Sequence, residues 1–278
     1  MKVISINVNG IRAAARKGMF DWLKKIDADV ICLQELKAQP DQIEDAAFHP
    51  EGYYSYFHSA EKKGYSGVGI YCKEKPTAVK VGLGSISNTD WTDVDSEGRY
   101  LQIDFKKISV ASLYLPSGSS KEERQDFKYD IMERMEPILQ SMQAESIAGK
   151  RDTIICGDWN IAHKKVDIKN WRGNQKNSGF LPEERAWMDW LLNDDDNIRA
   201  EPLAFVDAFR ETNQEESQYT WWSNRGQAWA NNTGWRIDYQ IATAGLKNLI
   251  IKNSELIYKN ERFSDHAPLV IEYDLPQA

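Results

Sequence analysis

The sequence has 278 residues but only three cysteines, and it has no apolar run long enough to cross a bilayer. Cys32, Cys72 and Cys156 each lie in a strand-like stretch and show none of the spacings of a metal site. An odd number of well-separated cysteines argues against a disulfide framework and indicates reduced, buried thiols. No apolar segment follows the first two residues, so we expect a soluble, cytoplasmic protein without a membrane partner.

The sequence also lacks an excess of positive charge. Its 35 lysines and arginines face 42 aspartates and glutamates, so the formal net charge is −7. This balance argues against a protein that coats nucleic acid non-specifically, because such proteins are usually basic. It is compatible with an enzyme that contacts a few phosphates through local basic loops, and with carboxylates that hold a hard cation.

No linker, low-complexity tract or short-period repeat interrupts the chain, which predicts a single domain over residues 1–278. Strands are expected at KVISINV, DVICLQE, GYYSYFH, SGVGIYCK, PTAVKVGL, RYLQIDF, ISVASLYLP and 152–157, and near 217–223, 235–243, 248–257 and 266–274. Helical spacing of apolar residues predicts helices at 18–28, 121–143 and 182–192. Short, regularly spaced strands with few helices predict an α/β fold of two packed sheets with helices outside.

Polar side chains recur at the ends of these predicted strands. Four follow or end a strand and two precede the last one; they are Asn7, Glu35, Asp158, Asn160, Asp265 and His266. If the last strand runs antiparallel to the others, all of these side chains meet at one edge. Packing alone does not account for six separate polar residues at strand ends, so these residues predict a functional site.

The residue types at this edge indicate hydrolysis assisted by a cation. Asp238, in a strand otherwise fit for burial, needs a partner, and His266 can supply it. No serine nucleophile accompanies this pair, so we expect His266 to polarise an oxygen. Glu35 with Asp265, assisted by Asn7 or Asn9, suits the sparse oxygen ligation of Mg²⁺. Asp158 is then free to accept a proton from water, with Asn160 orienting that water or a phosphate.

The motifs SINVNG, LQE, YSGVGI, EGRY, GDWNIAH, NWRGNQKNSGF, GWRIDYQ and SDHAPL occur in this order over about residues 1–275. Together they resemble the exonuclease III and apurinic/apyrimidinic endonuclease family, within the endonuclease/exonuclease/phosphatase superfamily. The resemblance implies a four-layer α/β sandwich, two packed mixed β-sheets flanked by helices. It also implies Mg²⁺-dependent hydrolysis of double-stranded DNA 5′ of abasic sites or at 3′ ends, with Mn²⁺ able to substitute, by a monomer.

The resemblance assigns a role to individual residues. Glu35 matches the main metal ligand, with Asp265 and Asn9 close to the metal and Asn7 hydrogen-bonding within the site. Asp158 matches the residue that prepares the attacking water, and Asn160 its neighbour. His266, held by Asp238, and Tyr114 match the residues at the scissile phosphate. Asn174 and Asn177 match DNA contacts, and Trp221 and Trp235 match the walls of the pocket. Further DNA contacts are matched by the basic or aromatic residues Tyr65, Arg99, Lys37 and Lys63.

The chain departs from this pattern at Asn9, where many relatives carry aspartate, and at Leu36, Ser117 and Trp159. The same departures resemble the catabolite repression control protein, a nuclease-inactive relative that acts with an RNA chaperone on messenger RNA. That branch is the alternative interpretation, with RNA and the chaperone as partners. The retained catalytic side chains favour the nuclease, because an unneutralised carboxylate cluster would repel phosphates unless a cation lies there.

Overall fold

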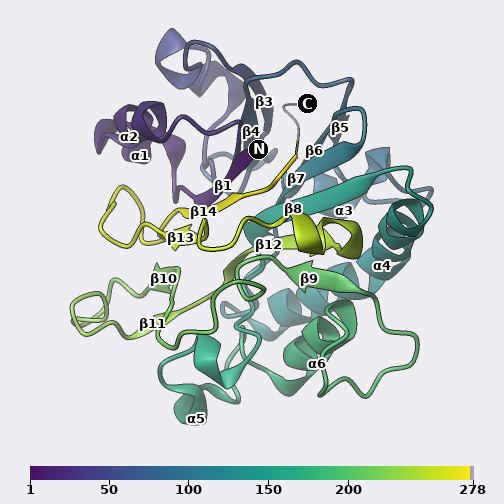
Figure 1. Ribbon diagram of the computed structural model, residues 1–278. Helices are drawn as coiled ribbons and strands as arrows, with labels where there is room; N and C mark the ends of the chain where they lie inside the picture. Colours follow the sequence, from purple (N-terminus) through teal and green to yellow (C-terminus); the bar gives the residue numbers. More distant parts are fainter. Residues whose placement is uncertain (276–278) are drawn as a thin grey trace.

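The computed structural model describes residues 1–275 as two mixed six-stranded β-sheets packed face to face, with helices on their outer sides (Figure 1). The first sheet has the strand order β13 (Leu256–Ile257), β14 (Leu269–Glu272), β1 (Lys2–Asn7), β2 (Val30–Gln34), β4 (Val68–Cys72) and β3 (Tyr54–His58). The second has the order β5 (Ala78–Val81), β6 (Tyr100–Asp104), β7 (Ile108–Tyr114), β8 (Asp152–Asp158), β12 (Asp238–Thr243) and β9 (Phe205–Asp207). The sheets confirm the predicted fold.

Helices cover the outer face of each sheet. Figure 1 shows α1 (Ile11–Arg16) and α2 (Met19–Ile26) beside the first sheet, and α4 (Glu122–Ile147) and α6 (Pro182–Leu191) beside the second. The shorter elements are α3 (Thr92–Asp95), α5 (Trp171–Asn174), the 3-10 turns η1 (Pro40–Gln42), η2 (Ala46–Phe48), η3 (Leu83–Ser85), η4 (Lys165–Asp167) and η5 (Ala244–Leu249), and the hairpin of β10 (Trp221–Trp222) with β11 (Gly234–Trp235). Among residues 1–275, none of the helices combines the length and apolar character of a bilayer-spanning helix.

Alternation along the strands creates the layers. In β2, Val30 and Cys32 belong to the core between the sheets, whereas Ile31 and Leu33 pack in the core beneath α1 and α2. A third core lies between the second sheet and helices α4 and α6. Successive strand residues point to opposite faces, so a strand buried on both faces is apolar throughout. All three cysteines are buried free thiols, as predicted.

The strand prediction for 248–257 was wrong over most of its length. That segment begins in the 3-10 turn η5 and then turns again before the two-residue strand β13. Asn253 adopts a left-handed φ of 63°, which asparagine tolerates better than most residues and which breaks an extended run. The strand predicted at 235–243 is likewise interrupted, between β11 and β12.

The strand directions bring the predicted polar ends together. In the first sheet β1 is parallel to β2 and antiparallel to β14, and in the second β7 is parallel to β8 and antiparallel to β12. The ends of β1, β2 and β8 therefore lie on the same edge as the starts of β12 and β14. We call this edge the catalytic rim, after the role that the sequence predicts for its residues.

Candidate active site

A cavity of about 970 Å³ opens at the catalytic rim. Its walls include most of the predicted site residues, namely Asn9, Glu35, Lys37, Tyr114, Asp158, Asn160, Asn177, Trp221, Trp235, Asp265 and His266. These side chains come from strand ends in both sheets and from the loops next to them, between positions 9 and 266. The fold thus gathers in one place residues that the sequence separates widely.

Asp158 ends β8 at the floor of this cavity and is 1% exposed. Its Oδ2 accepts a hydrogen bond from Asn7 Nδ2 at 2.8 Å, and its Oδ1 accepts one from the Asn160 backbone N–H at 2.9 Å. Burial, and next the nearby charge of Asp238, raise the pKa of Asp158 to about 8, although the charge of His266 opposes the shift. The carboxyl group is thus held in place and can exchange a proton near neutral pH.

Glu35 follows β2 in a left-handed conformation, with φ at 54°, and Asn160 has φ at 51°. Such angles are strained for residues other than glycine and persist only where the surroundings determine them. The amide of Asn7 donates 2.9 Å to Glu35 Oε1 as well as to Asp158, so one side chain links the carboxylates of the two sheets. The backbone turns after β2 and β8 therefore aim their polar groups into the same cavity.

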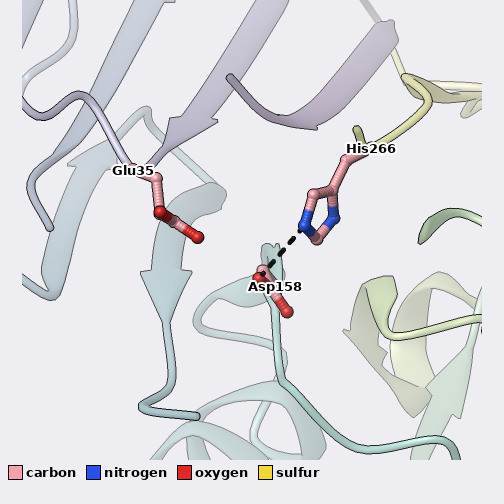
Figure 2. A group of neighbouring side chains, drawn as sticks. All are labelled: Glu35, Asp158 and His266. Atoms are coloured by element: carbon pink, nitrogen blue, oxygen red, sulfur yellow. Dashed lines mark ion pairs between the residues drawn. The ribbon is translucent and has the colours of Figure 1, made fainter. Parts of the chain in front are cut away.

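His266 precedes β14 and lies between two carboxylates. Its Nδ1 is 2.8 Å from Asp238 Oδ2, and its Nε2 is 3.9 Å from Asp158 Oδ2 (Figure 2). Burial lowers the pKa of His266, but the charge and hydrogen bond of Asp238 and the charge of Asp158 outweigh burial and raise it to about 10. The imidazole is therefore protonated at neutral pH and presents an N–H to the cavity.

Two carboxylates and the imidazole converge here, and the carboxylate oxygens are close enough together to hold a metal ion. The candidate ligand atoms of Glu35, Asp158 and His266 all lie within 4.8 Å of one another (Figure 2). Burial raises the pKa of Glu35, but the ammonium of Lys37 and hydrogen bonds lower it overall, so the carboxylate is charged. Lys37 Nζ lies 2.6 Å from Glu35 Oε2, which shows that this carboxylate attracts a cation.

Asp265 and Asn9 join the site through a chain of polar contacts. Lys37 Nζ donates to Asn9 Oδ1 at 2.5 Å, and Asn9 Nδ2 donates to Asp265 Oδ1 at 2.8 Å. Trp221 Nε1 donates to the other oxygen of Asp265 at 3.2 Å. Burial raises the pKa of Asp265, but the charge of His266 and these hydrogen bonds lower it overall, so Asp265 is a second charged carboxylate at the rim.

Tyr114 reaches the cavity, whereas Arg99 lies behind it. Arg99 is 2% exposed, and it donates to the Tyr114 carbonyl at 2.9 Å and to the Tyr65 hydroxyl at 2.9 Å. Arg124 donates to the same hydroxyl at 3.0 Å. A guanidinium buried beneath two tyrosines is placed to position them, and this burial does not suit the direct DNA contact expected of Arg99.

Two tryptophans and one asparagine form a further part of the cavity wall, which we call the far wall. Trp221 and Trp235 are paired across the β10–β11 hairpin, with their rings 6.1 Å apart in an edge arrangement. Asn177 lines the cavity and donates 2.8 Å to Asn174 Oδ1, while Asn174 lies outside the lining. Trp222 is buried on the opposite side of the hairpin from Trp221, as strand alternation predicts.

Several residues of the site were absent from the sequence-based prediction. The cavity is also lined by Lys121, Lys176 and Arg225, which surround its acidic floor with positive charge. Behind the floor lies a buried ion pair of Lys128 and Glu184. Lys128 begins a stripe of buried residues on α4 that continues through Ile131, Met132 and Met135. A lysine on an apolar helical stripe is the signal that could have identified it.

Comparisons with known proteins agree with this geometry. The model of the endonuclease/exonuclease/phosphatase family matches residues 4–266. An exodeoxyribonuclease of Bacillus subtilis (strain 168) is 37% identical over 271 residues, covering 97% of this chain and 98% of that protein. The DNA repair nuclease APEX1 of Danio rerio is 33% identical over 280 residues, which cover 98% of this chain and 81% of that protein. The structure of an AP endonuclease from Archaeoglobus fulgidus, 26% identical, superposes with a TM-score of 0.80 over 99% of this chain and all of that one. The chain therefore belongs to the endonuclease/exonuclease/phosphatase family.

Proposed function

We propose that this protein is a Mg²⁺-dependent DNA-repair nuclease that hydrolyses phosphodiesters 5′ of abasic sites, at DNA 3′ ends, or both. The observation that carries the proposal is the convergence of Asp158, His266 and Glu35 in one cavity. Attack of water on phosphorus needs a proton acceptor, a cationic donor and a carboxylate that holds a metal, with little covalent chemistry. Exodeoxyribonuclease and DNA-repair nuclease relatives support the same reaction class.

Asp158 accepts the proton of the attacking water in this proposal. A pKa of about 8 places the group near the range in which a general base works best at neutral pH. Each of its oxygens is already held by one hydrogen bond, from Asn7 and from the Asn160 backbone. A carboxylate oxygen can accept more than one bond, so the fixed group retains the capacity to orient a water.

His266 stabilises the phosphate. Asp238 accepts the proton of Nδ1, which leaves the Nε2–H pointing toward Asp158 and the cavity. A charged donor in a buried site acts strongly on an oxygen that gains negative charge during the reaction. Tyr114, held through its carbonyl by Arg99, lies on the same cavity wall and can contact the phosphate or the leaving oxygen.

Glu35 fits the principal metal ligand. It is charged, it attracts the Lys37 ammonium, and carboxylate oxygen is the ligand that Mg²⁺ prefers, with waters and substrate phosphate completing the shell. Asp265 and Asn9, linked to Glu35 through Lys37, assist at the same place. When bound, Mg²⁺, or Mn²⁺ in its place, supplies positive charge for the phosphate oxygens.

The far wall suits damaged DNA. Trp221 and Trp235 offer aromatic faces against which a sugar without its base can pack, and Asn177 offers an amide beside them. Lys121, Lys176 and Arg225 provide local positive charge for the DNA backbone, although the whole chain is acidic.

The test is a labelled duplex with one abasic-site analogue, incubated with the protein and Mg²⁺ or EDTA. Cutting that requires the metal and is absent in Asp158→Asn is the expected result. No cutting across Mg²⁺ and Mn²⁺ titrations, with intact and 3′-recessed duplexes also uncut, would overturn the proposal. In that event the regulator alternative would be tested by binding of A-rich RNA together with an RNA chaperone.

A further inference from the structure

A buried ion pair lies directly behind the catalytic rim. Lys128 of α4 and Glu184 of α6 approach to 2.5 Å between Nζ and Oε1, and both side chains are 0% exposed. Gln125 adds a hydrogen bond to the same carboxylate oxygen at 3.2 Å. Burial lowers the pKa of Lys128, and the charge of Glu184 opposes that change. The two helices that cover the second sheet are thus joined by opposite charges within the protein interior.

The other bonds of this pair reach the backbone of two functional segments. Lys128 Nζ donates to the Asn160 carbonyl at 2.8 Å. Glu184 Oε2 accepts from the backbone N–H groups of Gly179 at 2.7 Å and Leu181 at 3.0 Å. One partner therefore holds the turn that follows Asp158, and the other holds the segment that follows Asn177.

The turn at Asn160 depends on such outside support. Its φ of 51° is left-handed, its N–H is bonded to Asp158 Oδ1, and its side-chain Nδ2 donates 2.8 Å to the Leu115 carbonyl. The carbonyl of Asn160 is the remaining backbone group, and Lys128 satisfies it. A buried carbonyl without a partner is costly, so loss of the ammonium favours a different orientation of this peptide.

The two segments also touch each other. Gly179 has φ at 89°, and its carbonyl accepts from Ala162 N at 2.7 Å. A Cβ atom on Gly179 would lie 3.0 Å from the Asn160 carbonyl oxygen and 3.0 Å from the ring of Trp235. The catalytic turn and the DNA-facing wall therefore meet at Gly179, next to the ion pair.

Stability alone is a weak reason for such a pair. Removing two charges from water is unfavourable, and replacing a buried pair with apolar residues of similar volume is often neutral or stabilising. The hydrogen bonds of this ion pair to the backbone of two functional segments indicate another role. The pair fixes the position of the two segments relative to each other.

We propose that Lys128 and Glu184 are positioning residues, which set the Asp158–Asn160 turn against the 177–181 segment so that the water-activating carboxylate meets the bound phosphodiester. The inference rests on the proposed nuclease function, because it concerns the alignment of that same reaction. Neither residue lines the cavity, so both act through the backbone that they hold.

The experiment compares Lys128→Met, Glu184→Met and the double variant with the wild type on the abasic-analogue duplex. Each single change leaves one buried charge without its partner and is expected to lower the melting temperature. The double change removes both charges and is expected to recover most of that loss. Arg199→Met is the matched control, because it removes a pair between α4 and the segment after α6, Arg199 with Glu136, away from the cavity.

The positioning role predicts that kcat of the double variant stays low, by roughly 10- to 100-fold, although its melting temperature recovers. The rise in KM for the duplex is expected to be smaller than the fall in kcat, and Arg199→Met is expected to keep wild-type kcat. A double variant with wild-type kcat would overturn the inference. If the double variant shows no cooperative melting, Glu184→Gln is tested in its place, because glutamine keeps the size of the side chain and one hydrogen-bond acceptor. Wild-type kcat in Glu184→Gln would also overturn the inference.

The two proposals fail in distinguishable ways. A wild-type protein that cuts no duplex with Mg²⁺ or Mn²⁺ removes the nuclease function and this inference with it. A wild-type protein that cuts normally, beside a double variant that cuts equally fast, removes only the positioning role.

Discussion

Asp238 lies directly opposite Asp158 in the antiparallel ladder between β12 and β8, and His266 bonds to the first while its Nε2 faces the second. Two buried carboxylates on neighbouring strands repel each other, and the imidazolium between them offsets that repulsion. The charges of Asp158 and His266 influence each other, so a change at one alters the pKa of the other.

Replacing Asp158 with Asn is expected to abolish most turnover. The change keeps the shape of the side chain but removes the proton acceptor, which contributes about 10²- to 10⁴-fold to catalysis. Steady-state cleavage of the abasic-analogue duplex measures the loss, and fluorescence anisotropy in EDTA measures DNA affinity, which should stay near that of the wild type. Asp189→Asn, which alters a carboxylate paired with His163 outside the cavity, is the control. Normal turnover by Asp158→Asn would refute the assignment.

Glu35→Gln is expected to raise the Mg²⁺ concentration needed for half-maximal cleavage. The amide keeps one oxygen but loses the charge that attracts both the cation and Lys37. Binding of Mn²⁺, followed by electron paramagnetic resonance of the free ion, checks the same point without activity. Glu136→Gln on the outer face of α4 provides the comparison. An unchanged metal titration would contradict the ligand role.

The metal-free protein is expected to keep His266 charged well above neutral pH. An unfolded histidine titrates near pH 6.5, whereas the folded pKa is raised to about 10. The stabilisation from this group is therefore complete below about pH 6.5 and is lost as the pH rises through about 10. The raised pKa of Asp158, about 8, acts in the same direction, because the folded state disfavours its ionised form from about pH 4 upward.

Nitrogen-detected NMR of the imidazole in EDTA measures this titration, and melting temperatures over the same range measure its effect on stability. Asp238→Asn removes the strongest stabiliser of the imidazolium, so the transition should move to lower pH. A histidine that titrates near pH 6.5 in the wild type would show that the pairing seen here is not maintained in solution.

A second buried charge cluster is expected to control stability and not chemistry. Arg236 is 2.8 Å from Asp167 and 2.7 Å from Asp207, and all three side chains are buried. Arg236→Met leaves carboxylates without their counter-charge and should destabilise the fold by about 3–5 kcal/mol. Urea unfolding measures the loss, with the more exposed pair of Lys247 and Glu211 as a control expected to contribute under about 1 kcal/mol. Equal losses from Lys247→Met and Arg236→Met would contradict this ranking.

Most of the predicted residues line the cavity; local signals at strand ends indicated some of them, and the family resemblance supplied the others. A strand that ends in GDWN or LQE predicts a polar group at the edge of a sheet. The last strand runs antiparallel to β1 and brings Asp265 and His266 to the same edge. Short, regularly spaced strands with few helices predicted the two packed sheets. The strand predicted at 248–257 failed because η5 extends to Leu249 and a turn at the left-handed Asn253 follows, features that periodicity over so few residues does not reveal.

Other features depend on tertiary contacts that no local pattern encodes. Arg99 is basic and follows a glycine, which suggests exposure, but two tyrosines and the Glu97 carboxylate enclose it. Lys128 lies on the apolar stripe of its helix, which indicates burial, but the sequence does not identify Glu184 as its partner. Charged residues are seldom fully buried unless paired, and sequence spacing does not reveal the partner.

Because Glu35 follows β2 of one sheet and Asp158 ends β8 of the other, the distance between the proposed metal ligand and the proposed base depends on the spacing of the two sheets. Cys32 and Cys156, a few residues earlier on the same strands, belong to the packed layer that fixes that spacing. Protein interiors are close-packed and transmit added volume as displacement. A larger side chain at either cysteine position would thus change the spacing of the two sheets. Through that spacing, a substitution in the protein interior would alter the reaction at the surface cavity.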